Sequence, residues 1–311
     1  MKGLRFVGTG RCVPEKVVTN DDLSRLVDTS DEWIRTRTGI ARRHFSQGET
    51  AVELCTAAAR IALERAGIAP SEIGVCVVAT CTPDCASPSN ACLVQAALGL
   101  PEDIPCFDLA AGCTGFVYGL ETVRGLLTVS GKKYALLIGC EQLSRVLDMT
   151  DRSTCVLFGD GAGAAVLALE ERMWYAWLGS RGNRDVLWLN GPGPETTHLH
   201  MDGPGVYRFA VEALPACART LLAGSGLALE DIRWIVPHQA NRRIIETAAK
   251  RLNCPIDRFY QNMERYGNTS AASVPIALDE MAEQGLLQPG DRVMAIAFGA
   301  GLTWGGALFE W

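Results

Sequence analysis

The chain has 311 residues, enough for two domains or for one large duplicated domain. Its net charge of −6, with 48% hydrophobic and 21% charged residues, argues against a general nucleic-acid or membrane-surface binder. No run of about 18 apolar residues suits a membrane span, and the first residues lack the apolar core of a signal peptide. We therefore expect a cytoplasmic protein that binds neither nucleic acid nor membranes.

The 12 cysteines are expected to be reduced thiols, because disulfide frameworks belong mainly to small secreted chains. They are scattered singly, with Cys81 and Cys85 the closest pair, so no CxxC zinc or redox signature occurs. His198 and His200 could suggest a metal site, but no thiolate lies near them in the sequence and we expect them in a surface loop. The sequence thus predicts no metal site.

The N-terminal region is predicted to begin with a strand over Leu4–Thr9 and a short helix over Leu23–Val27. Trp33 then lies among polar residues with arginines nearby, in the stretch 30–40. Such a tryptophan either belongs to a packed loop or forms a flat apolar platform beside cations, suited to a nucleotide base and phosphates.

One cysteine lies where a predicted strand over 104–109 gives way to a predicted helix over 114–127. At the start of a helix, Cys113 would lie near unpaired backbone N–H groups and the positive end of the dipole, which favours thiolate over thiol. A protein can make a sulfur nucleophile in this way without a metal. The alternative is that Cys113 is one more small buried hydrophobic residue.

The two halves of the chain match each other at an offset of 159 residues without a gap. This offset lays Cys113 on Ala272 and also pairs Val52 with Val211, Gly67 with Gly226, Ile73 with Ile232 and Gly131 with Gly290. We therefore predict two copies of one α/β unit, over 1–170 and 171–311. Because a pseudo-twofold axis brings equivalent elements together, the helices that follow Cys113 and Asn268 should meet near the centre.

The internal symmetry predicts that two polar residues of the second half lie near Cys113. His238 follows the apolar run 232–237 at the end of a predicted buried strand, and Asn268 lies just ahead of the helix that matches the helix of Cys113. A hydrogen-bonded core histidine and a helix cap are the structural alternatives. Convergence of all three residues on one centre favours an active site made of Cys113, His238 and Asn268.

Two glycine-rich stretches, 158–164 and 298–304, are predicted to be tight turns. The second is also suited to present a backbone N–H group to an oxyanion. The first lacks the GK[ST] sequence of a phosphate-binding loop.

Together the motifs resemble the β-ketoacyl-acyl carrier protein synthase III family, the condensing enzymes that initiate type II fatty acid synthesis. The resemblance covers essentially the whole chain and rests on SDEW-I-x-TRTGI, A-x-CxGF, TDR followed by FGDGAGAAVL, VPHQAN and GNTSAASVP. It implies an α/β fold of the thiolase type, with two pseudo-symmetric halves in five αβαβα layers. Elongating synthases differ by a Cys-His-His set on a longer chain, and thiolases by a second cysteine.

The resemblance also implies an acyltransferase mechanism for this chain. Cys113 would take the acyl group of an acyl-CoA, while His238 and Asn268 would donate hydrogen bonds to the thioester carbonyl of malonyl-acyl carrier protein during loss of CO₂. The backbone N–H groups of Cys113 and Ala300 would hold the oxyanion of the condensation step. Acyl-CoA would be a substrate, and no metal or redox cofactor is implied.

Binding residues follow from the same resemblance. Trp33 and Arg152 would sandwich the adenine of CoA, with Arg37 near its phosphates and Asn241 along the pantetheine. The acidic carrier protein would dock on a basic surface made of Arg208, Arg243, Lys250 and Arg251. A solvated charged helix face explains Lys250 and Arg251 equally well.

The chain departs from the family at three positions. Pro204 replaces an asparagine that some members have near the pantetheine, and Ala300 replaces a frequent glycine. Ser87 replaces a bulky aromatic residue of acetyl-selective members, in a loop that reaches the partner's acyl pocket in the family's homodimer. A small residue there would leave room for primers longer than acetyl.

Two other functions remain open from the sequence alone. A specialised-metabolism acyltransferase of the same fold would move its acyl group to a small nucleophile instead of a carrier-bound malonyl group. A catalytically silent acyl-binding module would be expected to have lost Cys113, His238 or Asn268, and this chain retains all three.

Overall fold

The computed structural model describes residues 2–190 and 198–311 and contains two principal β-sheets. The first has the order β1 (Lys2–Cys12), β7 (Asp160–Glu171), β6 (Tyr134–Gln142), β4 (Ile73–Ala79), β5 (Cys106–Leu109). The second has the order β11 (Trp234–Pro237), β12 (Arg292–Gly299), β13 (Gly301–Glu310), β8 (Trp174–Asn183). Two small ribbons pair β2 (Val17–Thr19) with β3 (Arg42–His44) and β9 (Leu187–Trp188) with β10 (His200–Met201).

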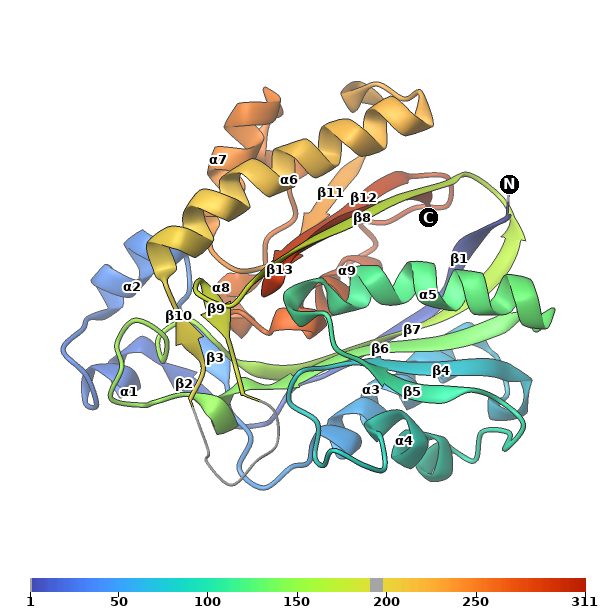
Figure 1. The fold of residues 1–311 in the computed structure, drawn as a ribbon, viewed down its shortest axis with the longest axis horizontal. Coiled ribbons are helices and arrows are strands. Elements are labelled where there is room, and N and C mark those ends of the chain that lie inside the picture. The colour runs from blue at the N-terminus through green and yellow to red at the C-terminus, as the bar shows by residue number, and fades with distance from the viewer. Residues whose placement is uncertain (1, 191–197) are drawn as a thin grey trace.

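Helices and sheets alternate as layers (Figure 1). One outer layer holds α3 (Ala51–Ala66) and α4 (Asn90–Leu98), and the opposite outer layer holds α6 (Gly203–Ser225) and α7 (Arg242–Leu252). Between the sheets lie α5 (Gly115–Ser130) and α9 (Ser273–Glu283). Residues Ser273 to Met281 of α9 are all buried, as expected for a helix covered on every side. The shorter helices are α1 (Asn20–Ser24), α2 (Asp31–Thr38) and α8 (Met263–Tyr266).

The two sheets share one pairing pattern. Strand β7 is antiparallel to both β1 and β6, and β6 is parallel to β4. In the second sheet β13 is antiparallel to both β8 and β12, and β12 is parallel to β11. The chain passes from the first pattern to the second between the end of β7 at Glu171 and the start of β8 at Trp174.

The internal match needs one correction at the cysteine. Short 3₁₀ turns, η2 (Gly112–Thr114) and η6 (Ser270–Ala272), precede α5 and α9, and each begins with a left-handed residue, Gly112 at φ 55° and Ser270 at φ 47°. Cys113 therefore corresponds to Ala271 rather than Ala272. The offset of 159 does hold for the earlier turns η1 (Pro70–Glu72) and η4 (Leu229–Asp231). The second half is thus one residue shorter than the first between the turns η4 and η6. A comparison of the two halves without gaps misses this difference.

Local signals explain several elements. Helix α3 begins with a capping box, in which the Thr50 hydroxyl accepts from the Glu53 N–H group and the Glu53 carboxylate accepts from the Thr50 N–H group. It ends at Gly67, whose φ of 64° suits glycine. The stretch around Trp33 is helix α2, capped by the Ser30 hydroxyl, so the packed-loop alternative is wrong.

The two glycine-rich stretches differ. Residues 298–304 form the β12–β13 hairpin, as predicted. The prediction of a turn at 158–164 is wrong for most of its length, because β7 begins at Asp160. Its glycines serve close packing instead: a Cβ atom on Gly163 would lie 2.6 Å from the backbone nitrogen of Ile276 in α9.

The described residues include no helix long and apolar enough to cross a membrane. They also contain no cluster of three or more histidine, cysteine or acidic side chains that would suit a metal ion. The expected surface loop at the paired histidines is partly wrong, because His200 lies in β10 and stacks on Trp188 with ring centroids 4.1 Å apart.

Candidate active site

Cys113 lines a largely apolar cavity of about 810 Å³. Segments that are distant in the sequence contribute to the cavity wall, including Phe158, Trp188, Ser270 and Ala300. Because His238 and Asn268 are buried and are not among the lining residues, only one of the three predicted catalytic side chains is directly accessible from this cavity.

The β12–β13 hairpin holds the backbone of Cys113 in place. A Cβ atom on Gly299 would lie 2.7 Å from the backbone nitrogen of Cys113, so only glycine fits there. The hydroxyls of Thr114 and Thr303 are 2.9 Å apart, and Thr303 also donates to the carbonyl of Ala300 at 2.9 Å. The backbone N–H groups of Cys113 and Ala300 therefore come from two segments that pack directly on each other.

The electrostatics of the Cys113 thiol are dominated by burial. Burial raises its pKa to about 12, a hydrogen bond with the Ser270 hydroxyl lowers it, and the nearby carboxyl of Glu141 raises it. The sequence-based expectation that the helix start favours thiolate is therefore outweighed by burial. Cys113 lies in η2, ahead of the first residue of α5, and lines the cavity.

His238 is oriented as a hydrogen-bond donor. Its Nδ1 atom is 2.7 Å from the Ser273 hydroxyl, which also accepts a 3.3 Å bond from the N–H group of Gln239. The hydroxyl proton can point to Nδ1, and in that arrangement the ring proton lies on Nε2. Burial lowers the pKa of His238 to about 3, so the ring is neutral at neutral pH. Phe298 packs edge-on against it at 5.4 Å.

Asn268 is fixed by both its backbone and its side chain. Its N–H group donates to Leu157 and its carbonyl accepts from Gly159, at 2.9 and 3.0 Å. The Oδ1 atom accepts from the N–H group of Ser270 at 2.9 Å, as in the helix-cap alternative. This bond leaves the Nδ2 amide hydrogens directed away from η6, so Asn268 is set to act as a donor.

The turns that precede α5 and α9 pack on each other near these residues. Turn η2 packs on η6 and on the end of β12, and a Cβ atom on Gly115 would lie 3.2 Å from the Cβ atom of Ala271. Ser270 donates its N–H group to Asn268 and also lines the cavity wall together with Cys113. Phe298 and Gly299 are adjacent residues that contact His238 and Cys113 respectively.

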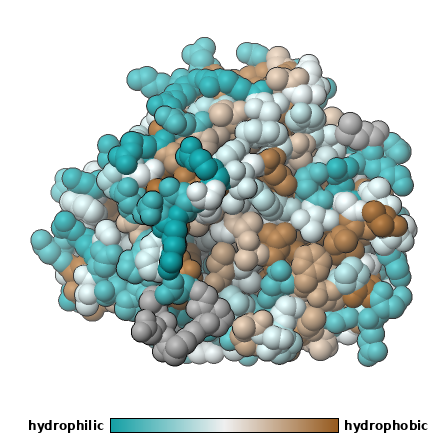
Figure 2. Space-filling model, in the orientation of Figure 1, coloured by the Kyte–Doolittle hydropathy of each residue, from teal (hydrophilic) through white to brown (hydrophobic). Residues whose placement is uncertain are grey.

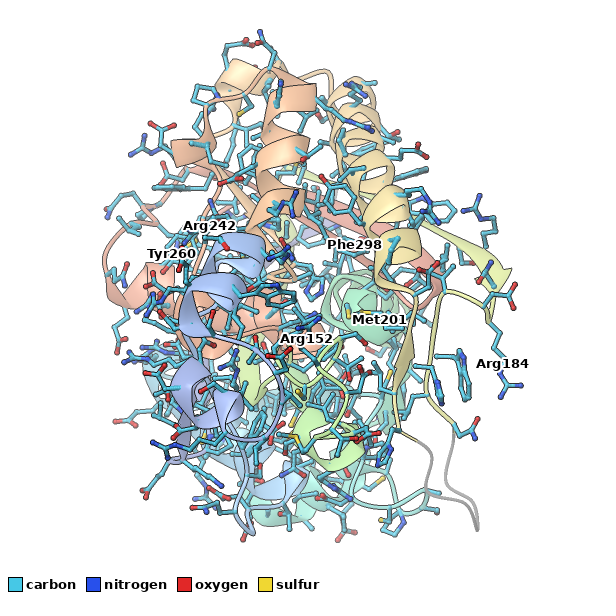
Figure 3. The ribbon with its side chains drawn as sticks, turned by 90° about the vertical axis from the view of Figure 1, so that its left-hand side faces the viewer. Arg152, Arg184, Met201, Arg242, Tyr260 and Phe298 are labelled. Atoms are coloured by element: carbon cyan, nitrogen blue, oxygen red, sulfur yellow. The ribbon has the colours of Figure 1, made fainter. Side chains whose placement is uncertain are left out.

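Two arginines flank Trp33 at one end of the molecule. The guanidinium carbons of Arg37 and Arg152 lie 4.5 and 4.9 Å from the indole centroid. Figure 3 shows Arg152 near α2, where its Nη1 atom donates to the carbonyl of Asp28 at 2.7 Å. An adenine between Trp33 and Arg152 needs about 7 Å, two stacking distances, so Arg152 has to move outward to admit one.

The other predicted binding residues lie on α6 and α7. Asn241 caps α7, with its Oδ1 atom accepting from the N–H group of Arg243 at 2.8 Å. Arg208 and Arg243 are exposed, and a 3.0 Å bond between Tyr207 and Thr247 joins the two helices between them.

The far end of α7 is less open to a partner. Lys250 is exposed about 10 Å along the helix from Arg243. Arg251 is exposed as well, but its guanidinium donates to the carbonyl of Val211 at 2.8 Å and so ties α7 to α6.

Ser87 is exposed and does not line the cavity in the single chain. Its neighbours Cys85, Ala86 and Ser89 do line it, so the loop forms part of the cavity rim.

Comparisons with known proteins cover the whole chain. Residues 107–182 match the family model described as 3-oxoacyl-[acyl-carrier-protein (ACP)] synthase III, and residues 222–311 match the model of its C-terminal part. The β-ketoacyl-[acyl-carrier-protein] synthase III of Clostridium beijerinckii is 45% identical over 100% of both chains. This chain belongs to the β-ketoacyl-acyl carrier protein synthase III family. It is a condensing enzyme of fatty acid synthesis and an acyltransferase.

Solved structures agree with this assignment. The synthase III of Aquifex aeolicus has a TM-score of 0.95 and 40% identity, covering 99% of this chain and 100% of its own. A priming β-ketosynthase from a polyketide pathway has a TM-score of 0.93 and 35% identity, covering 99% and 96%. The α/β fold predicted for the chain is therefore the fold of synthase III enzymes.

Three residues of this synthase III site escaped the sequence analysis: Glu141, Ser270 and Ser273. Ser270 and Ser273 lie in the motif GNTSAASVP, in which only Asn268 was predicted to be functional. Glu141 carried a usable signal, since it is the only charged residue in the otherwise apolar run 134–141. A carboxyl at the end of a buried strand is unusual and needs partners.

Proposed function

We propose that this synthase III condenses an acyl-CoA primer with malonyl-acyl carrier protein. Cys113 attacks the acyl-CoA carbonyl, its S–C bond forms as the S–C bond of CoA breaks, and CoA leaves as a thiol. Loss of CO₂ from the malonyl group then gives an enolate, which attacks the acyl carbonyl and releases Cys113 as the 3-oxoacyl product forms. The products are 3-oxoacyl-acyl carrier protein, CoA and CO₂.

The orientation of two buried donors carries this proposal. The Nε2–H group of His238 and the Nδ2 hydrogens of Asn268 are held by hydrogen bonds on their opposite atoms, at 2.7 and 2.9 Å. Decarboxylation puts negative charge on a thioester oxygen, and fixed donors stabilise such charge without reorganisation. The backbone N–H groups of Cys113 and Ala300 are proposed to serve the acyl-enzyme carbonyl in the same way.

Intact-protein mass spectrometry tests the reaction directly. The chain is incubated with acetyl-, isobutyryl-, butyryl- and octanoyl-CoA, and malonyl-acyl carrier protein is added afterwards. One adduct on Cys113 that disappears into a 3-oxoacyl carrier product supports the proposal, and its mass identifies the primer. An adduct that persists supports the acyltransferase alternative, and absence of any adduct contradicts both.

CoA is proposed to enter past α2. Trp33 and Arg152 would hold the adenine after Arg152 moves outward, with Arg37 at the phosphates and Asn241 at the pantetheine. The indole ring of Trp33 makes cation–π contacts with both arginines, and such a flat apolar ring is also suited to stack on a base. These contacts support the proposed CoA site.

The carrier protein is proposed to dock on Arg208, Arg243, Lys250 and Arg251. Charge reversal in Arg243→Glu is expected to lower kcat/KM for malonyl-acyl carrier protein by about tenfold at low salt, because steering by opposite charges is lost. The rate of Cys113 acylation by acyl-CoA should stay unchanged. The matched control is Arg233→Glu, at the opposite end of β11 from His238. Equal losses in both variants would contradict the docking site.

A homodimer is proposed to form through the edge of the first sheet. Strand β5 pairs only with β4 in that sheet, and its four residues are half-buried in the single chain. Figure 2 shows hydrophobic residues gathered on the right of this face, around α5 and β5. A strand edge beside apolar surface is a template for pairing with a second copy. Elution at twice the chain mass in size-exclusion chromatography with light scattering would support this.

Primer length is proposed to depend on Ser87 across that dimer. Ser87→Phe is expected to lower kcat/KM for butyryl- and isobutyryl-CoA by about tenfold while leaving acetyl-CoA unaffected, because a bulky ring would fill the partner's acyl pocket. Competition among the CoA primers measures the change. Strict acetyl preference in the parent, with no effect of the substitution on longer primers, would show that the loop does not select primers.

The two halves, 1–170 and 171–311, are proposed to be copies of one unit in a five-layered αβαβα fold. The shared pairing pattern of the sheets and the paired turns η2 and η6 support this. The enzyme is proposed to act in the cytoplasm, where its carrier and CoA substrates would be found.

A further inference from the structure

Glu141 is a fully buried carboxyl group at the end of β6. It accepts hydrogen bonds from the Thr82 hydroxyl at 2.6 Å, the Cys81 N–H group at 3.1 Å, the Ser270 hydroxyl at 3.1 Å and, weakly, the Thr80 hydroxyl at 3.5 Å. No lysine or arginine forms an ion pair with it among the described residues. Such a group is costly to keep charged, because hydrogen bonds alone offset its lost hydration.

The Ser270 hydroxyl connects this carboxyl to the cavity. It donates to the Oε1 atom of Glu141 at 3.1 Å and lines the same cavity wall as Cys113, because turn η6 of Ser270 packs on turn η2 of Cys113. Its hydroxyl also lowers the pKa of the Cys113 thiol. A hydroxyl has one proton to donate and two lone pairs, so it can accept from the thiol while donating to the carboxylate. The left-handed conformation of Ser270, at φ 47°, gives the side chain its position between the two groups.

We propose that Glu141 acts through Ser270 as the proton acceptor for Cys113 during acylation. The thiol proton of Cys113 passes to the Ser270 oxygen as the sulfur attacks the acyl-CoA carbonyl, and the Ser270 proton passes to Glu141. When the S–C bond of CoA breaks, the proton returns by the same two steps to the leaving sulfur. The proposal rests on the role of Cys113 as the nucleophile, and it makes Glu141 and Ser270 positioning residues for that proton.

Electrostatics favour this arrangement. Thiol with carboxylate and thiolate with carboxylic acid both carry one negative charge, so the transfer never places two charges in the buried site. Burial raises the pKa of Glu141 to about 7, where a group can both accept and return a proton near neutral pH. The titratable groups that interact with it are the thiols of Cys81, Cys113 and Cys140. Burial raises the pKa of Cys81, and a hydrogen bond with Cys55 together with burial raises that of Cys140.

The acylation rate of the parent should depend on the protonation of Glu141. Below about pH 7 Glu141 is protonated and cannot accept, so the acylation rate of the parent should fall as the pH is lowered. Without the acceptor, the rate should depend only on the thiolate fraction of Cys113, which rises tenfold per pH unit below the pKa of the thiol. The two profiles differ in shape as well as height.

The test measures single-turnover acylation by acetyl-CoA from pH 5.5 to 9, with intact-protein mass spectrometry as the readout. Glu141→Gln and Ser270→Ala are both expected to be at least tenfold slower at pH 7.5 and to rise steadily to pH 9. Thr82→Val removes one hydrogen-bond donor to the Glu141 carboxylate and should raise the pKa of that carboxyl further. The acylation rate should then begin to fall at a higher pH than in the parent. Glu280→Gln, another buried carboxyl that contacts Tyr260 and Tyr266, is the control and should keep the parent profile.

Two results would overturn the proposal. One is that Glu141→Gln and Ser270→Ala both acylate at the parent rate and show the parent's fall in rate at low pH. The other is that both variants acylate more slowly by the same factor at every pH and keep the parent's fall in rate at low pH, which would indicate a structural role only. If Glu141→Gln does not fold, Ser270→Ala decides alone. Failure of the parent to form any Cys113 adduct would instead contradict the proposed function.

Discussion

Cys113→Ala is expected to form no acyl-enzyme and to lower the condensation rate on the order of 10⁴-fold or more, because the covalent intermediate is lost. The thiol itself should react slowly with iodoacetamide at pH 7 and faster at pH 9. Burial raises its pKa to about 12, so its thiolate fraction grows with pH throughout this range.

Cys81→Ala is the matched control for this prediction. Cys81 lines the same cavity, and its contribution to Glu141 is a backbone N–H group that alanine retains. Acylation should therefore persist. A stable adduct on Cys81 or Cys85 in the Cys113→Ala protein, followed by transfer to malonyl-acyl carrier protein, would show that the wrong cysteine is assigned.

Asn268→Ala is expected to acylate Cys113 within about twofold of the parent rate but to condense about 10²–10³-fold more slowly. The Nδ2 donor is removed without adding a charge near Cys113, and losing one such donor typically costs this much. His238→Ala should show the same separation of half-reactions. The acylation step, measured in the same protein, serves as the internal control.

The pH dependence of the second half-reaction adds an independent check. Since burial lowers the pKa of His238 to about 3, the ring should remain neutral down to about pH 4. Condensation by pre-acylated enzyme should therefore not lose activity through protonation of His238 between pH 7 and 5. Condensation at the parent rate in Asn268→Ala would contradict the role given to this residue.

Local sequence was sufficient where hydrogen bonds are made within a few residues. The two ends of helix α3 are specified by Thr50, Glu53 and Gly67, all of which lie in the helix or next to it. The strand that precedes Cys113 and the helix that follows it were found for the same reason.

Prediction failed where the packing partner is distant in the sequence. The stretch 158–164 has the composition of a turn, but Gly161 and Gly163 lie in β7 because α9 packs against them. The one-residue error at Cys113 has a similar origin, since only the backbone shows that Gly112 and Ser270 are equivalent left-handed positions.

The sequence by itself determined the family and the layered α/β class and singled out Cys113, His238 and Asn268 as candidate catalytic residues, because these depend on motifs and on spacing along the chain. Only the tertiary structure decided the electrostatic environment of those groups. Enclosure by distant segments raises the pKa of the Cys113 thiol, lowers that of His238 and joins Ser270 to Glu141. Burial and hydrogen bonding are properties of the assembled site, so no single stretch of sequence contains them.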